Sequence, residues 1–282
     1  MKKFFIFLLI SIFFVFSLSY AQENTNNIKL IGVVIASNIQ EDEYGLTLLD
    51  GIFSIINFDK LPQTDTFPVY SRWMGNGKHN IELNLLNPSK EKILGTITGS
   101  FELIRENDVL FSLGTFEDIA FEESGVHWIQ VKADGKLLKE IPLFILENGE
   151  DVKIPEALTQ KPILIFSLPA LEIYENDDGL TSLKGVYEYY TTDELPFTDS
   201  FIIANGWMSG EGEYNQHIEI FSPDKNLLYK SEPQTFEINA GSVVTLFDEV
   251  SDFSFEKEGD YLVKVFLNDE EVNSFVLKVI KK

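Results

Sequence analysis

Residues 255–267 read Phe-Glu-Lys-Glu-Gly-Asp-Tyr-Leu-Val-Lys-Val-Phe-Leu. Hydrophobic side chains recur there at every second position: Tyr261, Val263, Val265 and Leu267. A period of two places such side chains on one face of a β-strand, whereas an amphipathic helix would need a period near 3.6. The following Asn268-Asp269 pair is typical of a tight turn. The segment therefore predicts a half-buried strand that ends in a hairpin.

The same pattern extends through the rest of the chain. A matching run is formed by His127, Ile129, Val131 and Ala133. Further alternating or short apolar runs are residues 29–36, 46–56, 67–74, 81–86, 162–170, 180–190, 201–208 and 216–221. Pairs such as Asp134-Gly135 and Asn87-Pro88 separate them, and no sustained helical stripe follows residue 21. About seven or eight short strands in each half predict antiparallel β-sandwiches.

The two halves are copies of each other. Trp73-Met74 recurs as Trp207-Met208, an offset of 207 − 73 = 134. The same offset pairs Ala36 with Ala170, Gly51 with Gly185, Leu61-Pro62 with Leu195-Pro196, Phe121-Glu122 with Phe255-Glu256 and Gly125 with Gly259. Between Pro88/Pro223 and Phe101/Phe236 the offset is 135, and by Asp118/Asp252 it is again 134. A register this constant predicts two homologous modules, residues 27–147 and 161–281.

Residues 148–160 separate the two modules. This segment is polar and contains Pro155. Such a composition is typical of a linker, so we expect the modules to move relative to each other.

Three aromatic residues refine the fold prediction. Trp73 and Trp207 end strands in the middle of their modules, where an immunoglobulin-like sandwich places its core tryptophan. Tyr261 lies two residues after Gly259 at the start of a late strand, like the tyrosine that bonds to backbone at a sandwich corner. We therefore predict an all-β protein of two tandem immunoglobulin-like antiparallel β-sandwich domains that follow an N-terminal signal peptide.

These motifs resemble a family of bacterial exported or cell-surface modules that is known only as a domain of unknown function. The matching segments are Ala36, Gly51, Trp73-Met-Gly-Asn-Gly77 and Phe121-Glu-Glu-Ser-Gly-Val-His127 in the first copy, and Ala170, Gly185, Trp207-Met-Ser-Gly-Glu-Gly212 and Phe255-Glu-Lys-Glu-Gly-Asp-Tyr261 in the second. The first copy departs from the pattern because His127 replaces the tyrosine. The resemblance implies a β-sandwich and supplies no activity, cofactor or catalytic residue.

Residues 1–21 have the pattern of a secretory signal peptide. Lys2 and Lys3 precede the apolar run 4–18, and Ser19-Tyr20-Ala21 fits a cleavage site that leaves Gln22 first. The alternative is an uncleaved membrane anchor, because the run approaches the length of a spanning helix. We predict a secreted, periplasmic or otherwise extracytoplasmic protein that is cleaved after Ala21 and not stably inserted in the membrane.

Composition excludes several functions. The chain has 282 residues, a formal charge of −23 and no cysteine. The negative charge argues against nucleic-acid binding, which needs a basic surface. The absence of cysteine excludes disulfides, thiolate metal sites and thiol nucleophiles. A hydrophobic content of 44% excludes a disordered chain.

No motif for catalysis is present. Of the three histidines, His127 aligns with Tyr261 and is expected in the core, while His79 and His217 do not align with each other. The Gly-rich segment Ser209-Gly-Glu-Gly212 lacks the lysine and the following helix of a phosphate-binding loop. We predict no catalytic residue, no cofactor site and no enzymatic activity.

Two acidic loops occupy equivalent places in the modules. They contain Glu41, Asp42 and Glu43 in the first copy and Glu175, Asp177 and Asp178 in the second. Carboxylates in sandwich loops can bind Ca²⁺, but such a site usually takes six or more oxygens from several segments. The simpler interpretation is a solvated hairpin turn. Calcium binding by these loops therefore stays an alternative.

The repeated residues are mostly apolar, Gly or Pro, which serve the fold rather than chemistry. Trp128, Tyr189 and Tyr190 could stack on sugars if they face outward, although packing under a loop or against the other module explains Trp128 more simply. We predict an exported, non-catalytic binding or structural protein with a protein or other envelope partner. The alternative is a Ca²⁺- or glycan-binding extracellular module.

Overall fold

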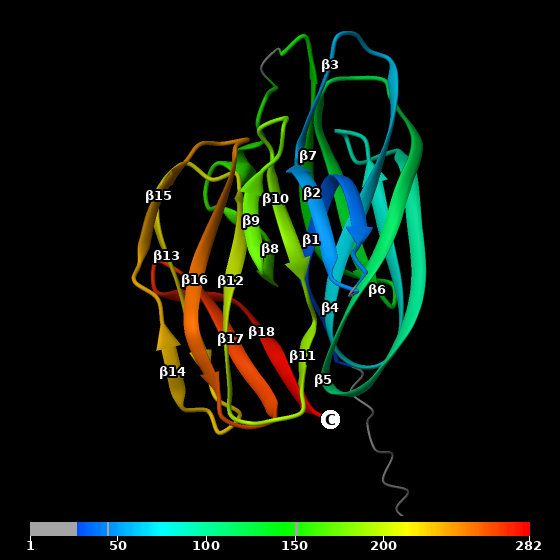
Figure 1. Ribbon diagram of the computed structural model, residues 1–282. Helices are drawn as coiled ribbons and strands as arrows, with labels where there is room; N and C mark the ends of the chain where they lie inside the picture. The colour runs from blue at the N-terminus through cyan, green and yellow to red at the C-terminus, as the bar shows by residue number, and fades with distance from the viewer. Residues whose placement is uncertain (1–26, 44, 150–151) are drawn as a thin grey trace, which may run out of the picture.

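The computed structural model describes residues 27–43, 45–149 and 152–282, so the predicted signal peptide lies outside the described residues. Strands account for nearly all of the structure, as predicted (Figure 1). The first module contains β1 (Ile28–Glu41), β2 (Thr47–Phe53), β3 (Ile55–Phe58), β4 (Gln63–Leu86), β5 (Ile93–Phe121), β6 (Gly125–Ala133) and β7 (Lys136–Glu147). The described chain holds no apolar helix of membrane-spanning length.

The second module repeats these strands in the same order. It contains β8 (Ile163–Ala170), β9 (Glu172–Glu175), β10 (Thr181–Val186), β11 (Tyr189–Thr192), β12 (Phe197–Met208), β13 (Gly212–Phe221), β14 (Leu227–Lys230), β15 (Gln234–Ile238), β16 (Val243–Phe255), β17 (Gly259–Leu267) and β18 (Glu270–Lys281). The long strands β1, β4 and β5 correspond to two or three shorter strands each in this copy. The duplication inferred from the sequence is therefore present in the fold.

Most strand pairs are antiparallel, as predicted, but each module has one parallel pair. β3 runs parallel to β7, and β11 runs parallel to β18. In both copies a glycine with positive φ, Gly51 (φ 65°) or Gly185 (φ 70°), lies within two residues of the end of the preceding strand, and the chain then runs alongside the last strand of its module. The predicted antiparallel sandwich is confirmed, and these two parallel edge pairs are a feature that the alternation did not indicate.

Alternation correctly predicted which side chains are buried. Tyr261, Val263, Val265 and Leu267 all point into the second core, and their counterparts from His127 to Ala133 are buried in the first module. The two tryptophans have equivalent surroundings. Trp73 packs against Phe101, and Trp207 packs against Phe236, with 5.9 Å between ring centroids in both pairs. The residues that identify the repeat therefore form equivalent cores.

The tyrosine corner is present in the second module. The buried Tyr261 hydroxyl donates to the Lys257 carbonyl (3.0 Å) and accepts from the Lys257 N–H (3.2 Å). In the first module, His127 takes this place with its ring edge-on to Phe121 at 5.2 Å and its Nδ1 3.4 Å from the Gly125 carbonyl. Burial lowers the pKa of His127, so the imidazole is neutral at pH 7.

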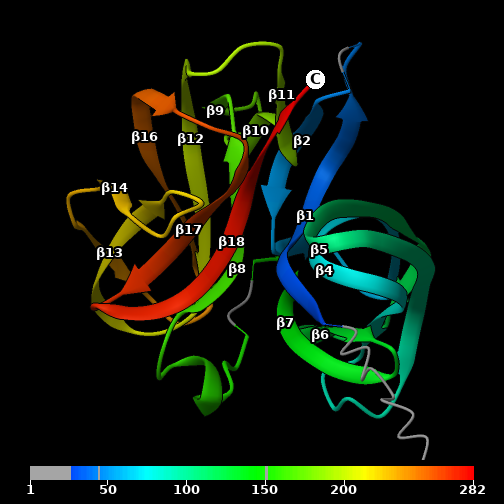
Figure 2. The same cartoon turned by 90° about the horizontal axis from the view of Figure 1, so that it is seen from below.

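The modules share one β-sheet. Eight strands of the nine-stranded sheet run in the order β3-β7-β6-β4-β1-β2-β10-β9, and the ninth, β5, pairs with β4. The sheet therefore crosses from the first module to the second between β2 and β10. Figures 1 and 2 show the two modules side by side with these strands at the junction. The expectation of mobile modules rested on the composition of residues 148–160 and did not include this strand pairing. Part of that segment is packed: Leu158, in the 3-10 turn Glu156–Leu158, is buried.

An approximate twofold axis relates the modules. β2 and β10 are equivalent strands, and they pair antiparallel with Leu49 directly opposite its own counterpart, Leu183. A second contact between counterparts joins Gly32 and Phe166, where a Cβ on Gly32 would lie 2.7 Å from the Phe166 Cβ. Equivalent residues touch each other only beside a twofold axis, as in an isologous dimer. The protein is thus a pseudo-symmetric dimer within a single chain.

Candidate functional site

A bulge in β5 forms one wall of a pocket between the modules. Gly75 of β4 pairs with Asp108 and Gly77 pairs with Leu103, so one residue of β4 faces four residues of β5. These four residues, 104–107, fold over the Asp108 side chain. Its Oδ2 accepts the backbone N–H groups of Arg105 (2.8 Å) and Ile104 (3.1 Å). The bulge therefore has a defined shape.

Residues of the second module hold the bulge in place. Lys278 of β18 donates from Nζ to Asp108 Oδ1 at 2.8 Å, and Asn107 donates to Asp260 Oδ2 at 3.1 Å. Partial burial alone would raise the pKa of Asp108, but hydrogen bonds from Lys278 and from two backbone N–H groups outweigh it and lower that pKa. The carboxylate is consequently ionised at neutral pH and ties the two modules together.

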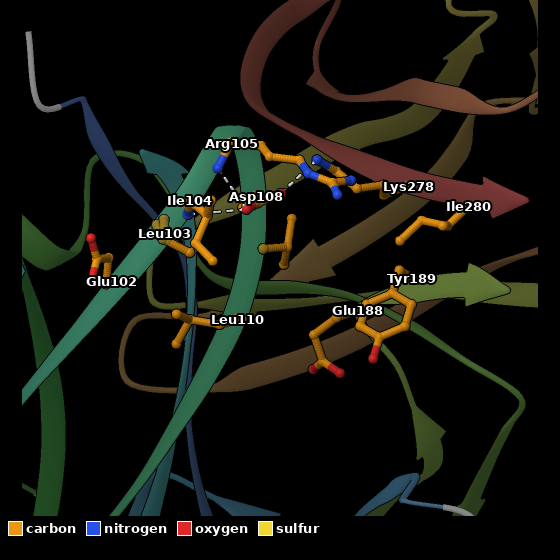
Figure 3. Close-up of a pocket in the computed structure, with 11 residues that line it drawn as sticks. Glu102, Leu103, Ile104, Arg105, Asp108, Leu110, Glu188, Tyr189, Lys278 and Ile280 are labelled. Atoms are coloured by element: carbon orange, nitrogen blue, oxygen red, sulfur yellow. Dashed lines mark hydrogen bonds and ion pairs between the residues drawn. The ribbon is translucent and has the colours of Figure 1, made fainter. Parts of the chain in front are cut away.

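The pocket beneath the bulge has a volume of about 360 Å³. It is lined by Glu102, Leu103, Ile104, Arg105, Asp108, Val109, Leu110, Glu188, Tyr189, Lys278 and Ile280. Figure 3 shows the side chains of β5 on one side and those of β11 and β18 on the other. Two large apolar side chains at its rim face solvent: Ile104 is 85% exposed and Tyr189 is 54% exposed.

A carboxylate that lines the pocket lies near a buried cation. Glu188 Oε1 accepts the Tyr70 hydroxyl at 3.4 Å. Burial raises the pKa of Glu188, an effect that the nearby Arg72 guanidinium reduces. Arg72 is fully buried over the ring of Phe275, 5.3 Å from its centroid. Glu188 thus connects the pocket to the interface between the modules.

The turn of the second module that corresponds to the bulge makes apolar rather than polar contacts with the other module. The corresponding turn, residues 239–242, lies against the first module, where a Cβ on Gly241 would be 3.5 Å from Phe144. Phe144 is the counterpart of Lys278, because 144 + 134 = 278. One side of the junction therefore makes an apolar contact, and the other makes the polar Asp108–Lys278 contact. The pocket in Figure 3 lies on the polar side, and a second pocket at the corresponding place on the other side is lined by Ser54, Ile55 and Ser242 among others.

The structure does not bring the two acidic loops together. Glu41, Asp42 and Glu43 lie at the β1–β2 turn, and Glu175, Asp177 and Asp178 lie at the β9–β10 turn. Because β2 and β10 are antiparallel, the two turns lie at opposite ends of this pair. Both are hairpin turns: Asp42 Oδ1 accepts the Leu46 N–H at 2.9 Å, and Asn176 Oδ1 accepts the Leu180 N–H at 3.0 Å. Within the described residues, no three His, Asp or Glu side chains are grouped to hold a metal ion.

The other candidates have structural contacts. His79 is buried between the Asp134 carboxylate (2.8 Å) and the Asn76 carbonyl (2.7 Å). His217 stacks on Phe266, with 4.6 Å between ring centroids. Trp128 is buried beneath the Lys90 ammonium, which lies 3.8 Å from the centroid of its ring. Packing under a loop, the simpler interpretation of Trp128, is therefore what the structure shows.

Sequence reasoning did not identify the bulge, although one signal was present. The offset between the copies changes from 135 at Phe101/Phe236 back to 134 at Asp118/Asp252. The first copy must therefore have one extra residue between those positions, and the bulge lies there. Tyr189 was identified only as a sugar platform, and its partner Tyr190 is half-buried against Phe255.

Comparisons with known proteins support the duplication. A family model described as a family of unknown function (DUF6941) matches residues 32–146 and again residues 170–280. No curated protein matches the sequence. One similar solved structure is the CARDB domain of a Pyrococcus furiosus protein, in complex with di-metal ions. It is 10% identical with a TM-score of 0.24, over 46% of this chain and 99% of that one. The family match confirms tandem copies of a domain of unknown function.

Proposed function

The chain belongs to the family of unknown function that both of its modules match, and from that premise we propose that it is an exported, non-catalytic protein that binds a protein partner at the pocket between its modules. One observation carries the proposal. Ile104 and Tyr189, from different modules, are exposed on opposite sides of one pocket. Exposed apolar side chains that gather around a concave surface are typical of an interaction site.

The supporting residues are arranged for binding rather than for chemistry. Asp108 and Lys278 are bonded to each other at 2.8 Å, so they hold the bulge in position. Ile104 is thereby presented by a fixed loop, which lowers the entropy cost of binding. The buried histidines of the protein are likewise engaged with neighbouring groups, as shown for His79. These contacts support a binding role over a catalytic one.

Charge indicates which partner fits. The chain carries a formal charge of −23. Among the charged residues that line the pocket, Asp108 is paired with Lys278, which leaves the two carboxylates of Glu102 and Glu188 against the single cation of Arg105. A complementary segment would combine apolar residues with lysine or arginine, because opposite potentials steer association. We therefore propose an extended, basic and apolar segment of another envelope protein as the partner.

Site-specific photo-crosslinking in the native envelope tests the binding site. A photoreactive residue in place of Ile104 is expected to give one discrete protein adduct. The same residue in place of Leu137, which is also exposed but lies outside the pocket, is the matched control. The adduct at position 104 should weaken strongly when Tyr189 is replaced by Ala. Identical adducts at both positions, or none at position 104, would contradict the proposal.

Export is a separate part of the proposal. It is supported by the lysines at positions 2 and 3, the apolar run 4–18 and the Ala21 cleavage pattern. Mass spectrometry of the protein from its native host should find a mature chain that begins at Gln22. An intact N-terminus in the cytosolic fraction would show that the protein is not exported.

A further inference from the structure

A second pocket lies between the modules, close to the approximate twofold axis. It has a volume of about 360 Å³ and is lined by Ile28, Lys29, Leu30, Ile31, Leu138, Lys139, Leu164, Val272 and Asn273. Several of these residues are counterparts: Leu30 with Leu164, Leu138 with Val272 and Lys139 with Asn273. The walls come from β1 and β7 of the first module and from β8 and β18 of the second (Figure 2).

Two lysines distinguish this pocket from the rest of an acidic protein. Lys29 donates from Nζ to the carbonyl (2.6 Å) and hydroxyl (3.0 Å) oxygens of Ser274. Lys139 donates from Nζ to the Leu164 carbonyl. Neither ammonium is ion-paired with a carboxylate among the described residues, although Glu271 is near enough to act on Lys29. Each ammonium has three donors, so both keep donors for a further acceptor.

Burial makes the charged form of these two lysines energetically unfavourable unless an anion lies nearby. Burial lowers the pKa of Lys29, and it lowers the pKa of Lys139 to about 8. Lys139 is still mostly protonated at pH 7, so two partly buried positive charges line one pocket. A buried charge is stabilised chiefly by an opposite charge and by hydrogen bonds. An anion in the pocket would provide both.

The apolar walls restrict the kind of anion. Apart from the two lysines and Asn273, the pocket is lined by isoleucine, leucine and valine. The volume falls within the range of roughly 300–1,000 Å³ that is usual for small-molecule sites. A fully hydrated inorganic ion would leave these walls without contacts, whereas a short hydrocarbon chain would cover them.

We propose that this pocket binds a small amphiphilic carboxylate, with its carboxylate between Lys29 and Lys139 and its alkyl chain against the leucine side chains. The counterpart positions show that both lysines of this pocket come from the first module alone. Where the first module has Lys29 and Lys139, the second has Ile163 and Asn273. Asn273 donates from Nδ2 to the Ile31 carbonyl at 3.3 Å and closes one side of the pocket.

Titration of the full chain with sodium octanoate at pH 7 tests the proposal. Isothermal titration calorimetry should find one site with a Kd in the millimolar range or tighter, on the order of 1 mM. Acetate, which lacks the chain, and octyltrimethylammonium, which has the opposite charge, should each bind at least about tenfold more weakly. In methyl-labelled protein, the Leu164 and Val272 resonances should shift on addition of octanoate.

Variants locate the site. Lys29→Met and Lys139→Met should each weaken octanoate binding at least about tenfold, because a charge pair is lost. Lys139→Arg retains the charge and should retain most of the affinity, so it serves as the folded control for that position. Lys161→Met removes an exposed lysine paired with Glu270 and should change nothing. The proposal is overturned if wild-type protein shows no saturable octanoate binding, if the cationic amphiphile binds equally well, or if binding survives both Met substitutions.

Discussion

Phe166 fills space that two glycines leave open, and alanine at those glycines tests how the modules pack. A Cβ added at Gly206 would lie 2.3 Å from the Phe166 ring atom Cε1 and 2.7 Å from Cδ1 and Cζ. A Cβ added at Gly32 would instead lie 2.7 Å from the Phe166 Cβ and 2.8 Å from its Cα. Carbon atoms in good contact are about 3.5–4.0 Å apart, so both substitutions overpack the junction.

We expect Gly206→Ala and Gly32→Ala each to lower the free energy of unfolding by about 1–3 kcal/mol. Phe166→Ala alone should cost about 3–5 kcal/mol, because it leaves a cavity. It also deletes the ring atoms that meet a methyl group at position 206. The double variant Gly206→Ala/Phe166→Ala should therefore be no less stable than Phe166→Ala. This corresponds to a coupling free energy of about 1–3 kcal/mol between the two substitutions. The Cα and Cβ that meet position 32 persist in alanine, so Gly32→Ala/Phe166→Ala should be close to additive.

Urea unfolding followed by tryptophan fluorescence measures all of these differences. Gly99→Ala is the matched control, because its methyl group would lie 3.4 Å from the nearest atom of Ile81. This control should change stability by no more than about 0.5–1 kcal/mol. The packing inferred here is refuted if Gly206→Ala is as mild as Gly99→Ala, or if Phe166→Ala rescues both glycine substitutions equally.

Four further outcomes are expected. Tyr261→Phe removes the hydroxyl that bonds to Lys257 and should cost about 1–2 kcal/mol in urea unfolding, whereas Tyr189→Phe at an exposed ring should cost nothing measurable. Burial lowers the pKa of Lys139 to about 8, which is below its pKa in the unfolded chain. Above about pH 8 the unfolded state therefore binds more protons than the folded state, so the destabilisation caused by burying this ammonium decreases as the pH rises. Calorimetry should accordingly show wild-type protein gaining stability relative to Lys139→Met between about pH 7 and pH 9.5, and a constant difference would contradict this. Calcium at about 5 mM should raise the Tm no more than magnesium does, because the acidic turns are far apart; a selective rise with calcium would revive the metal site. A protease site inserted after Gly149 and cut in the folded protein should leave one particle in size-exclusion chromatography, and separation into halves would show that the shared sheet does not hold the modules together.

The sequence predicted the parts of the fold in which burial is one-sided. Tyr261 and its alternating neighbours reveal their strand because one face meets the core and the other meets solvent. β5 escaped prediction because much of Ile93–Phe121 is exposed on both faces, so its side chains carry no period of two. Trp128 is a different exception: it lies on the outer face of its strand and is nevertheless buried, because Lys90 covers it. Alternation reports one-sided burial, and it fails where both faces are covered or both are open.

The candidate sites depend on contacts between the copies, which alternation within one copy cannot show. Comparing the copies indicated an extra residue near the β5 bulge but gave no reason to place Lys278 beside Asp108. The axis itself became visible only through the pairing of Leu49 with Leu183. Both pockets combine residues more than 80 positions apart, and they exist because equivalent strands pair antiparallel.

The two copies differ in sequence at positions beside the axis, because identical side chains there would either clash or leave a gap. Position 32 has room for a side chain in only one copy, because Gly32 already touches the backbone of Phe166. The ring of Phe166 in turn lies over Gly206, the counterpart of Arg72. In a homodimer every substitution occurs twice, so two copies of the second module would bring two phenylalanines together at the axis, and two copies of the first would leave a gap. A single chain escapes this constraint, because each copy can change by itself. Covalent duplication thus allowed complementary large and small residues at the junction, and the same freedom placed two lysines on one side of a pocket that symmetry would otherwise have made uniform.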